Sequence, residues 1–186
     1  SSLTLPASSY SVLIDWGDGS PQSTGQVTPD LVADAADPTL KHFVVTGEHT
    51  YREAQTTPYV ITVFVTQNSS GLFSSSQTAH VLDSVTINDA PLTPGVSLPI
   101  FATENVPLND VAVATFTDAN LFSSAGDFTA TINWGDGTAV DPNARIVKTG
   151  GTAAGILYTV YGSHDYTTTG NFATEVTVSD EDSPAA

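Results

Sequence analysis

Cysteine and methionine are both absent from this chain of 186 residues. Without cysteine the chain can form no disulfide, no thiolate nucleophile and no cysteine-ligated zinc site. Basic residues are scarce as well: 4 Lys and Arg stand against 20 Asp and Glu, which gives a formal net charge of −16. Nucleic-acid binding depends on basic patches that neutralise phosphates, so we exclude that class of partner.

Long hydrophobic runs are also missing, although hydrophobic residues make up 40% of the chain and charged residues only 13%. No apolar stretch approaches the ~18 residues of a membrane-spanning helix, so we expect no membrane insertion. The apolar content is still sufficient for one or two folded domains. Because the chain begins at Ser1 without an initiator methionine or a signal segment, we expect it to be a piece of a longer protein.

Three sequence motifs occur twice and in the same order, which predicts an internal repeat. Residues 14–20 (IDWGDGS) recur as residues 132–138 (INWGDGT). A Gly-x-His-x-Tyr segment follows each copy, with 33 residues from Trp16 to His49 and 30 from Trp134 to His164. A segment of alternating apolar residues then closes each copy, at 59–65 and at 172–178. Three ordered matches make coincidence implausible.

The repeated segments have the period of a β-strand. Phe128, Ala130, Ile132 and Trp134 alternate with polar residues and therefore lie on one face of an extended strand. The Gly-Asp-Gly that follows can adopt positive φ angles, so we expect a tight hairpin into a second strand. No helical period extends over ten residues. Short strands between Gly, Pro, Asp and Ser turns predict an antiparallel β-sandwich.

These motifs resemble the PKD (polycystic kidney disease) domain, which is an immunoglobulin-like β-sandwich. The resemblance is carried by Trp-Gly-Asp-Gly, by the His-x-Tyr that follows, and by the Thr- and Val-containing strand after it. It covers both halves of the chain. It implies an all-β fold of two tandem immunoglobulin-like (PKD-type) antiparallel β-sandwiches. We expect domains at 1–90 and 96–186, with a proline-containing linker at 91–95 that stiffens the pair.

Both copies depart from the family pattern at one end. Strands expected at 96–102 and 107–117 open the second copy, whereas only nine residues precede Tyr10 in the first. A closing strand is expected at 77–88 in the first copy, whereas the second ends eight residues after Val178. Incomplete sandwiches expose strand edges. We therefore expect strand exchange between chains, or ordering through neighbouring repeats of the same parent chain.

Four of the repeated residues are expected to build the scaffold. Trp16 and Trp134 bury large rings between the sheets, where they contribute much of the apolar area of the core. Asp18 and Asp136 lie between two glycines, where a short carboxylate accepts backbone N–H groups and fixes the turn. The same carboxylates could instead ligate a metal ion, an alternative that we weigh lower.

The second repeated motif supplies histidines and tyrosines. Tyr51 and Tyr166 have the position of a tyrosine corner, in which the hydroxyl bonds to upstream backbone. His49 and His164 are expected to bond a loop rather than a metal. Although Ser163 and Asp165 flank His164, adjacent residues of an extended segment point to opposite faces and cannot converge as a catalytic triad. We expect no enzymatic activity.

Calcium is the one cofactor that the sequence supports, because its many Asp residues are hard oxygen ligands. Some PKD-like domains bind calcium where the interdomain linker meets the loop between the second and third strands. The resemblance places the matching ligands in the linker and in that loop. They are Asn88, Asp89, Asp118, Asn120 and Asp127. The same residues fit a solvated acidic surface equally well.

Two functions remain open. The first is a non-enzymatic extracellular repeat that acts as a semi-rigid spacer or adhesion element of a large bacterial cell-surface or secreted protein. A composition rich in Thr, Ser, Val and Asp and poor in Lys is typical of such β-modules. The second is an accessory module of a secreted hydrolase that binds polysaccharide or protein. It requires exposed aromatic residues, for which the candidates are Phe73, Phe122, Tyr158 and Tyr161.

Overall fold

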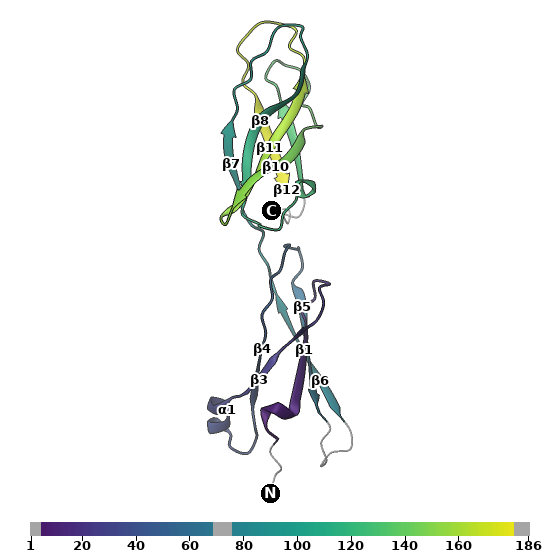
Figure 1. Ribbon diagram of the computed structural model, residues 1–186, viewed down its shortest axis with the longest axis vertical. Coiled ribbons are helices and arrows are strands. Elements are labelled where there is room, and N and C mark those ends of the chain that lie inside the picture. Colours follow the sequence, from purple (N-terminus) through teal and green to yellow (C-terminus); the bar gives the residue numbers. More distant parts are fainter. Residues whose placement is uncertain (1–4, 69–75, 181–186) are drawn as a thin grey trace. The chain divides into compact units, whose positions relative to one another are not determined.

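The computed structural model describes residues 5–68 and 76–180 (Figure 1). These residues form β-strands, all paired antiparallel, with almost no helix, which confirms the predicted all-β class. The chain divides into two compact units. Unit 1 comprises Ser1–Tyr51 and Gln55–Ile87, and unit 2 comprises Arg52–Ala54 and Asn88–Ala186.

Unit 1 contains two sheets. The larger has the strand order β2-β1-β5-β6 and the smaller pairs β3 with β4. The strands are β1 (Tyr10–Asp15), β2 (Ser23–Thr24), β3 (Gln26–Pro29), β4 (Phe43–Thr46), β5 (Tyr59–Gln67) and β6 (Gln77–Val85). A 3-10 turn η1 (Ala7–Ser9) precedes them and a short helix α1 (Leu31–Ala36) connects β3 to β4.

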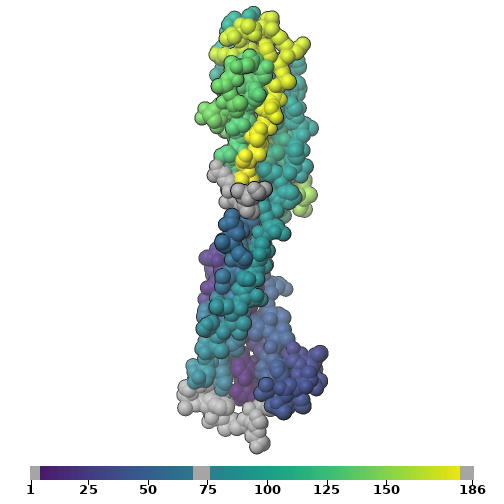
Figure 2. Space-filling model, turned by 180° about the vertical axis from the view of Figure 1, so that it is seen from behind, coloured from purple at the N-terminus to yellow at the C-terminus, as the bar shows by residue number. Residues whose placement is uncertain are grey.

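Unit 2 also contains two sheets, with the strand orders β10-β11-β8-β7 and β12-β9. The strands are β7 (Leu92–Ser97), β8 (Leu108–Asp118), β9 (Phe128–Asn133), β10 (Arg145–Thr152), β11 (Gly155–His164) and β12 (Glu175–Asp180). A 3-10 turn η2 (Ala125–Asp127) precedes β9. In the space-filling view, β12 (yellow) runs along one side of this unit, beside the teal residues that include β7 and β8 (Figure 2).

The strand register shows that the repeated motifs occupy equivalent places. Ile14 of β1 pairs with Val63 of β5, and Ile132 of β9 pairs with Val176 of β12. The segment that follows the Gly-Asp-Gly turn also pairs in the same way in both units. Ile14 pairs with Ser23, and Ile132 forms a bridge with Asp141, in each case nine residues later. β1 and β5 are therefore the counterparts of β9 and β12.

The core is well developed in unit 2. Side chains from both sheets meet there, and Ile132, Trp134, Tyr158 and Val160 are almost completely buried. Apolar and polar residues alternate along β9, and this alternation accounts for the contribution of β9 to the core. Phe128, Ala130 and Ile132 are buried, while the intervening threonines are less buried. In unit 1 the buried apolar residues among those described are Val12, Ile14 and Tyr59.

Several local expectations differ from the structure. The segment predicted as a linker at 91–95 overlaps β7, which pairs with β8 and so belongs to a sheet of unit 2. β7 ends at Ser97 rather than near residue 102, because Pro99 has no N–H to continue the ladder. The turn after Trp16 is not a tight two-residue hairpin, and the strand that returns from it, β2, has only two residues.

Candidate functional site

Trp134, Asp136, His164 and Tyr166 form one cluster in unit 2, which we call the tryptophan cluster. Trp134 and Asp136 follow β9, and His164 ends β11 with Tyr166 two residues beyond it. Trp134 and Tyr166 are buried, and the His164 and Asp136 side chains are each about nine-tenths covered. Residues about thirty positions apart in the chain therefore meet at one end of the β9 strand.

The two glycines beside Asp136 make this turn possible. Gly135 and Gly137 have φ angles of +79° and +87°, a region that side chains with a Cβ rarely adopt. A Cβ on Gly135 would lie 2.4 Å from the carbonyl oxygen of Ala173, so the backbone of the adjacent segment leaves no room for it. A Cβ on Gly137 would meet no atom within 4 Å.

The Asp136 carboxylate joins the turn to β11. Its Oδ1 accepts the backbone N–H of Thr138 at 3.1 Å and the Thr138 hydroxyl at 2.6 Å, while Oδ2 lies 2.8 Å from Nε2 of His164. Hydrogen bonds from Thr138 and His164 lower the pKa of Asp136 to about 2. The carboxylate is therefore ionised under all physiological conditions.

The rings of the cluster pack against one another. The His164 imidazole stacks on Trp134 with 4.8 Å between centroids and 7° between planes, and the edge of Tyr166 approaches it at 4.6 Å. The Tyr166 hydroxyl donates to the backbone carbonyl of Trp134 at 3.2 Å. Aromatic contacts of this kind add stability beyond the area that they bury.

Unit 1 contains the same arrangement. His49 Nε2 lies 2.8 Å from Asp18 Oδ2, its ring stacks on Trp16 at 5.0 Å, and the Tyr51 hydroxyl donates to the Trp16 carbonyl at 3.0 Å. Burial alone raises the pKa of Asp18, but hydrogen bonds from Ser20 and His49 outweigh it and bring the pKa to about 2. The pairing of each histidine with the aspartate of the turn was not foreseen from the sequence.

The indole N–H of the tryptophan has different surroundings in the two clusters. Trp16 Nε1 donates to the Ser23 hydroxyl at 2.8 Å. In unit 2 the equivalent position is Asp141, and the buried Trp134 Nε1 has no hydrogen-bond partner among the described residues. An unpaired buried donor costs stability.

The chemistry open to the tryptophan cluster is limited by what surrounds His164. The neighbouring Ser163 hydroxyl accepts the backbone N–H of Asp110 at 2.9 Å and so bonds to β8. The imidazole itself is held between Asp136, Trp134 and Tyr166. This arrangement fixes the ring and the turn, which is a scaffold role.

The five residues expected to bind calcium all belong to unit 2, but the structure uses several of them in local turns. Both Asp127 oxygens accept from Ser124 in a capping box, and Asn120 Oδ1 accepts the N–H of Phe122. Asn88 and Asp89 lie just before β7, outside any strand. Among the described residues, no group of three Asp, Glu, His or Cys side chains could hold a metal ion.

Asp118 is the exception among these five residues. Its side chain is 1% exposed; Oδ1 accepts the N–H of Asn120 at 2.9 Å, whereas the buried Oδ2 has no hydrogen-bond partner among the described residues. The buried Tyr158 hydroxyl contacts Ser123 Oγ at 2.9 Å. Burial raises the pKa of Tyr158, and Asp118, Asp127 and Asp180 raise it further, against the effect of Ser123. The negative charge of these three carboxylates disfavours ionisation of the hydroxyl.

The aromatic residues considered for polymer binding lie in different surroundings. Tyr158 is a core residue and is completely buried, so it offers no binding surface. Tyr161 is partly buried and carries the Arg145 guanidinium 4.4 Å from its ring centre. Phe122 is half exposed. Phe73 falls outside the described residues.

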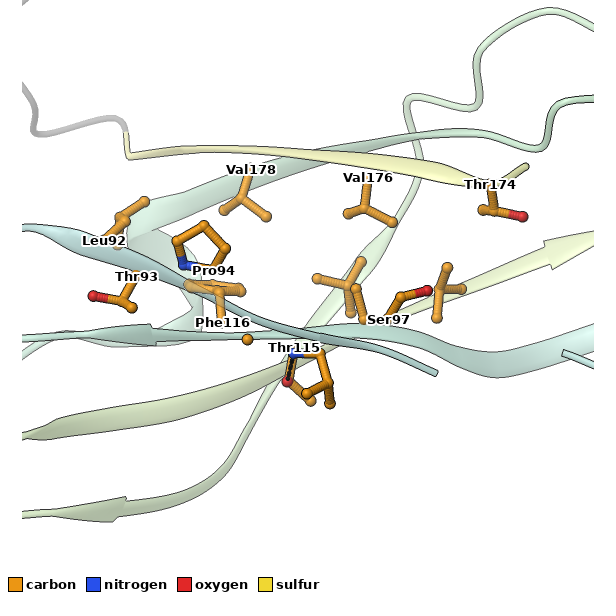
Figure 3. A pocket seen from close by; sticks show the side chains of 14 residues that line it. Leu92, Thr93, Pro94, Ser97, Thr115, Phe116, Thr174, Val176 and Val178 are labelled. Carbon is orange, nitrogen blue, oxygen red and sulfur yellow. Dashed lines mark hydrogen bonds between the residues drawn. The ribbon is translucent and has the colours of Figure 1, made fainter. Parts of the chain in front are cut away.

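An apolar pocket of about 310 Å³ lies between β7 and β12 of unit 2 (Figure 3). Its lining combines Leu92, Pro94 and Phe116 on one side with Val176 and Val178 on the other. The sequence predicts exposed strand edges in this copy but does not locate this pocket, because its position depends on which strands lack a neighbour.

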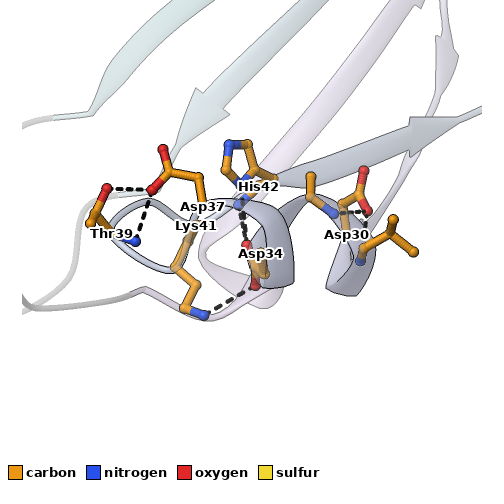
Figure 4. Close-up of polar contacts among 8 residues, drawn as sticks. Asp30, Asp34, Asp37, Thr39, Lys41 and His42 are labelled. Carbon is orange, nitrogen blue, oxygen red and sulfur yellow. Dashed lines mark hydrogen bonds and ion pairs between the residues drawn. The ribbon is translucent and has the colours of Figure 1, made fainter.

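A second polar cluster surrounds α1 in unit 1 (Figure 4). Asp30 caps the helix by accepting the N–H groups of Val32 and Ala33. Asp34 accepts the backbone N–H of His42 at 2.7 Å and lies 3.1 Å from Lys41 Nζ, contacts that lower its pKa. Because each of these carboxylates serves a cap or a turn, the cluster stabilises the connection from β3 to β4.

Comparison of the chain with protein-family models, with curated proteins and with solved structures gives no match. None of the helices in the described part of the chain has the length and apolar character needed to cross a membrane.

Proposed function

We propose that this chain is a non-enzymatic pair of PKD-like, immunoglobulin-type β-sandwich repeats that serves as a semi-rigid spacer in a larger bacterial surface or secreted protein. The observation that carries the proposal is the duplicated tryptophan cluster. In each unit the Asp, His and Tyr side chains bond to the turn and to one another. In both units, the side chains that could take part in catalysis are thereby used to fix the fold.

Calcium fits this proposal at Asp118. A buried carboxylate oxygen without a partner favours a cation, and Ca²⁺ accepts irregular sets of carboxylate and carbonyl oxygens. Asp118 would supply the buried ligand. A bound cation would neutralise this buried carboxylate, and so would stiffen this end of the unit.

The thermal unfolding midpoint with millimolar Ca²⁺ and with excess chelator tests the calcium part. A ligand that binds only the folded state raises the midpoint, by roughly 2–4 °C for each kcal/mol in a chain of this size. We expect Asp118→Asn to abolish the rise and Asp165→Asn, at an exposed position, to keep it. Equal midpoints in calcium and chelator, or an unchanged rise in Asp118→Asn, would rule out this site.

Affinity electrophoresis against a panel of polysaccharides separates the spacer from an accessory binding module. A binding module needs a flat aromatic surface, and burial of Tyr158 leaves Tyr161 and Phe122 as the described candidates. We expect no polymer to slow migration of the chain relative to a non-binding protein of similar charge. Retardation that Phe122→Ala reverses would replace the spacer with the binding module.

A further inference from the structure

The β12 strand of unit 2 has one edge that no described strand occupies. It pairs with β9 alone, whereas its counterpart β5 in unit 1 lies between β1 and β6. The equivalence of the two strands rests on register, since Ile14–Val63 and Ile132–Val176 are matching pairs. The repeat therefore shows what occupies this position when it is filled: an antiparallel strand of nine residues, β6.

The vacant edge of β12 lies beside the apolar pocket between β7 and β12. We call this pocket the seam. Val176 and Val178 of β12 point toward Leu92, Pro94 and Phe116 across the seam, and Thr174, just before β12, also lines it (Figure 3). Strand β7 offers a poorer edge for addition, because Pro94 lacks an N–H and the β7–β8 register shifts between Pro94 and Ser97. Exposed apolar surface next to a vacant strand edge favours binding of an extended peptide.

We propose that the seam binds an extended segment of a partner polypeptide that has the residue pattern of β6 and adds to β12 as an antiparallel strand. The register in unit 1 defines the pattern. Ala79, Val81, Asp83 and Val85 of β6 stand opposite Val65, Val63, Ile61 and Tyr59 of β5. Transferred to unit 2, this pattern places small apolar residues opposite Val178, Val176 and Phe172, where they cover the seam, and one carboxylate opposite Thr174.

A second copy of this chain is a poorer occupant. Its net charge of −16 opposes close approach of two copies. Its own β6 is also held by nine register pairs to β5, which would have to break before the strand could be donated. A separate segment with the same apolar alternation has neither cost.

The experiment uses a synthetic peptide with the sequence of residues 77–85 (QTAHVLDSV) and the full chain. Hydrogen exchange is measured with and without the peptide, and a matched peptide carrying Val81→Asp is the control. We expect the first peptide to slow exchange of backbone amides in residues 175–179 at least tenfold and the control to have no effect. The control adds a second carboxylate to this face, beside that of Asp83, and its burial opposite Val176 accounts for the difference.

Three outcomes would overturn the proposal. They are an absence of protection at 175–179, equal protection by both peptides, and protection confined to residues 59–67, where the peptide would simply replace β6. Sedimentation of the chain alone completes the test. A dimer that already shields residues 175–179 would assign the seam to a second copy instead.

Discussion

At the scale of single residues, the fold of each unit depends on positions whose contacts require one particular type of residue. Gly135 approaches the Ala173 carbonyl, Asp136 bonds to the turn and to His164, and Tyr166 bonds to the Trp134 carbonyl. The short distances along the chain within this motif allowed the turn role of Asp136 to be predicted. The histidine partner could not be, because it depends on how the end of β11 folds back onto the turn.

Gly135 and Gly137 form a matched pair for substitution. Gly137→Ala should cost about 1–2 kcal/mol of unfolding free energy, because only its positive φ is unfavourable. Gly135→Ala has the same φ penalty and in addition places a methyl group against the Ala173 carbonyl, so it should cost at least ~2 kcal/mol more. Urea unfolding of both variants measures the difference. Equal costs would show that the close approach to Ala173 is absent in solution.

Asp141→Ser should leave unit 2 about 1 kcal/mol more stable than Asp141→Ala, the usual contribution of one hydrogen bond, because both substitutions remove the bond from the Asn143 N–H to Asp141 Oδ1. In unit 1, Ser23 accepts the indole N–H of Trp16 at the equivalent position, and the substitution offers Trp134 the same partner. Asp141→Ala is the control, since it removes the carboxylate without adding a hydroxyl. If the serine and alanine variants unfold at the same urea concentration, the hydroxyl does not reach the indole.

At the scale of elements, the strands with clear alternation were predictable and the irregular segments were not. The alternation places Phe128, Ala130 and Ile132 on the core face of β9, where they are buried. Helix α1 has six residues, too few for a helical period to show, and its formation depends on the Asp30 cap and the Asp34 contacts to the next strand. The sequence predicts that the second copy lacks a closing strand, but which strand then has an edge without a neighbour depends on long-range pairing.

The bonds from Asp18 and Asp136 tie the turn after one strand to the end of another, and they predict a specific acid response. Each carboxylate has a pKa of about 2 in the folded chain against an ordinary value of 3.8. A lowered pKa stabilises the fold fully above about pH 4, and this stability is lost as the pH falls from 4 toward 2. Unfolding free energies between pH 2 and 5 should therefore fall steeply with acid, and less steeply in Asp136→Asn. An identical slope in that variant would contradict the assignment.

At the scale of the whole molecule, the proposed function rests on the repetition of one unit. Matching registers of β1–β5 and β9–β12 and a tryptophan cluster in each unit are what a protein built by adding modules would need. The repeat and the all-β class could be predicted from the sequence because each motif recurs in order. The stiffness of the pair is a property of the joint and calls for a direct measurement.

The distance between spin labels on the two units tests the spacer most directly. Because the chain has no cysteine, labels can be placed at Thr24→Cys and Thr177→Cys alone, both at exposed positions. A pair of labels at Thr152→Cys and Thr177→Cys, both within unit 2, gives the width of the distance distribution for a rigid reference. The account predicts an inter-unit distribution about as narrow as this reference in calcium. A distribution several times broader than the reference in calcium would show flexibly joined units and contradict the semi-rigid spacer.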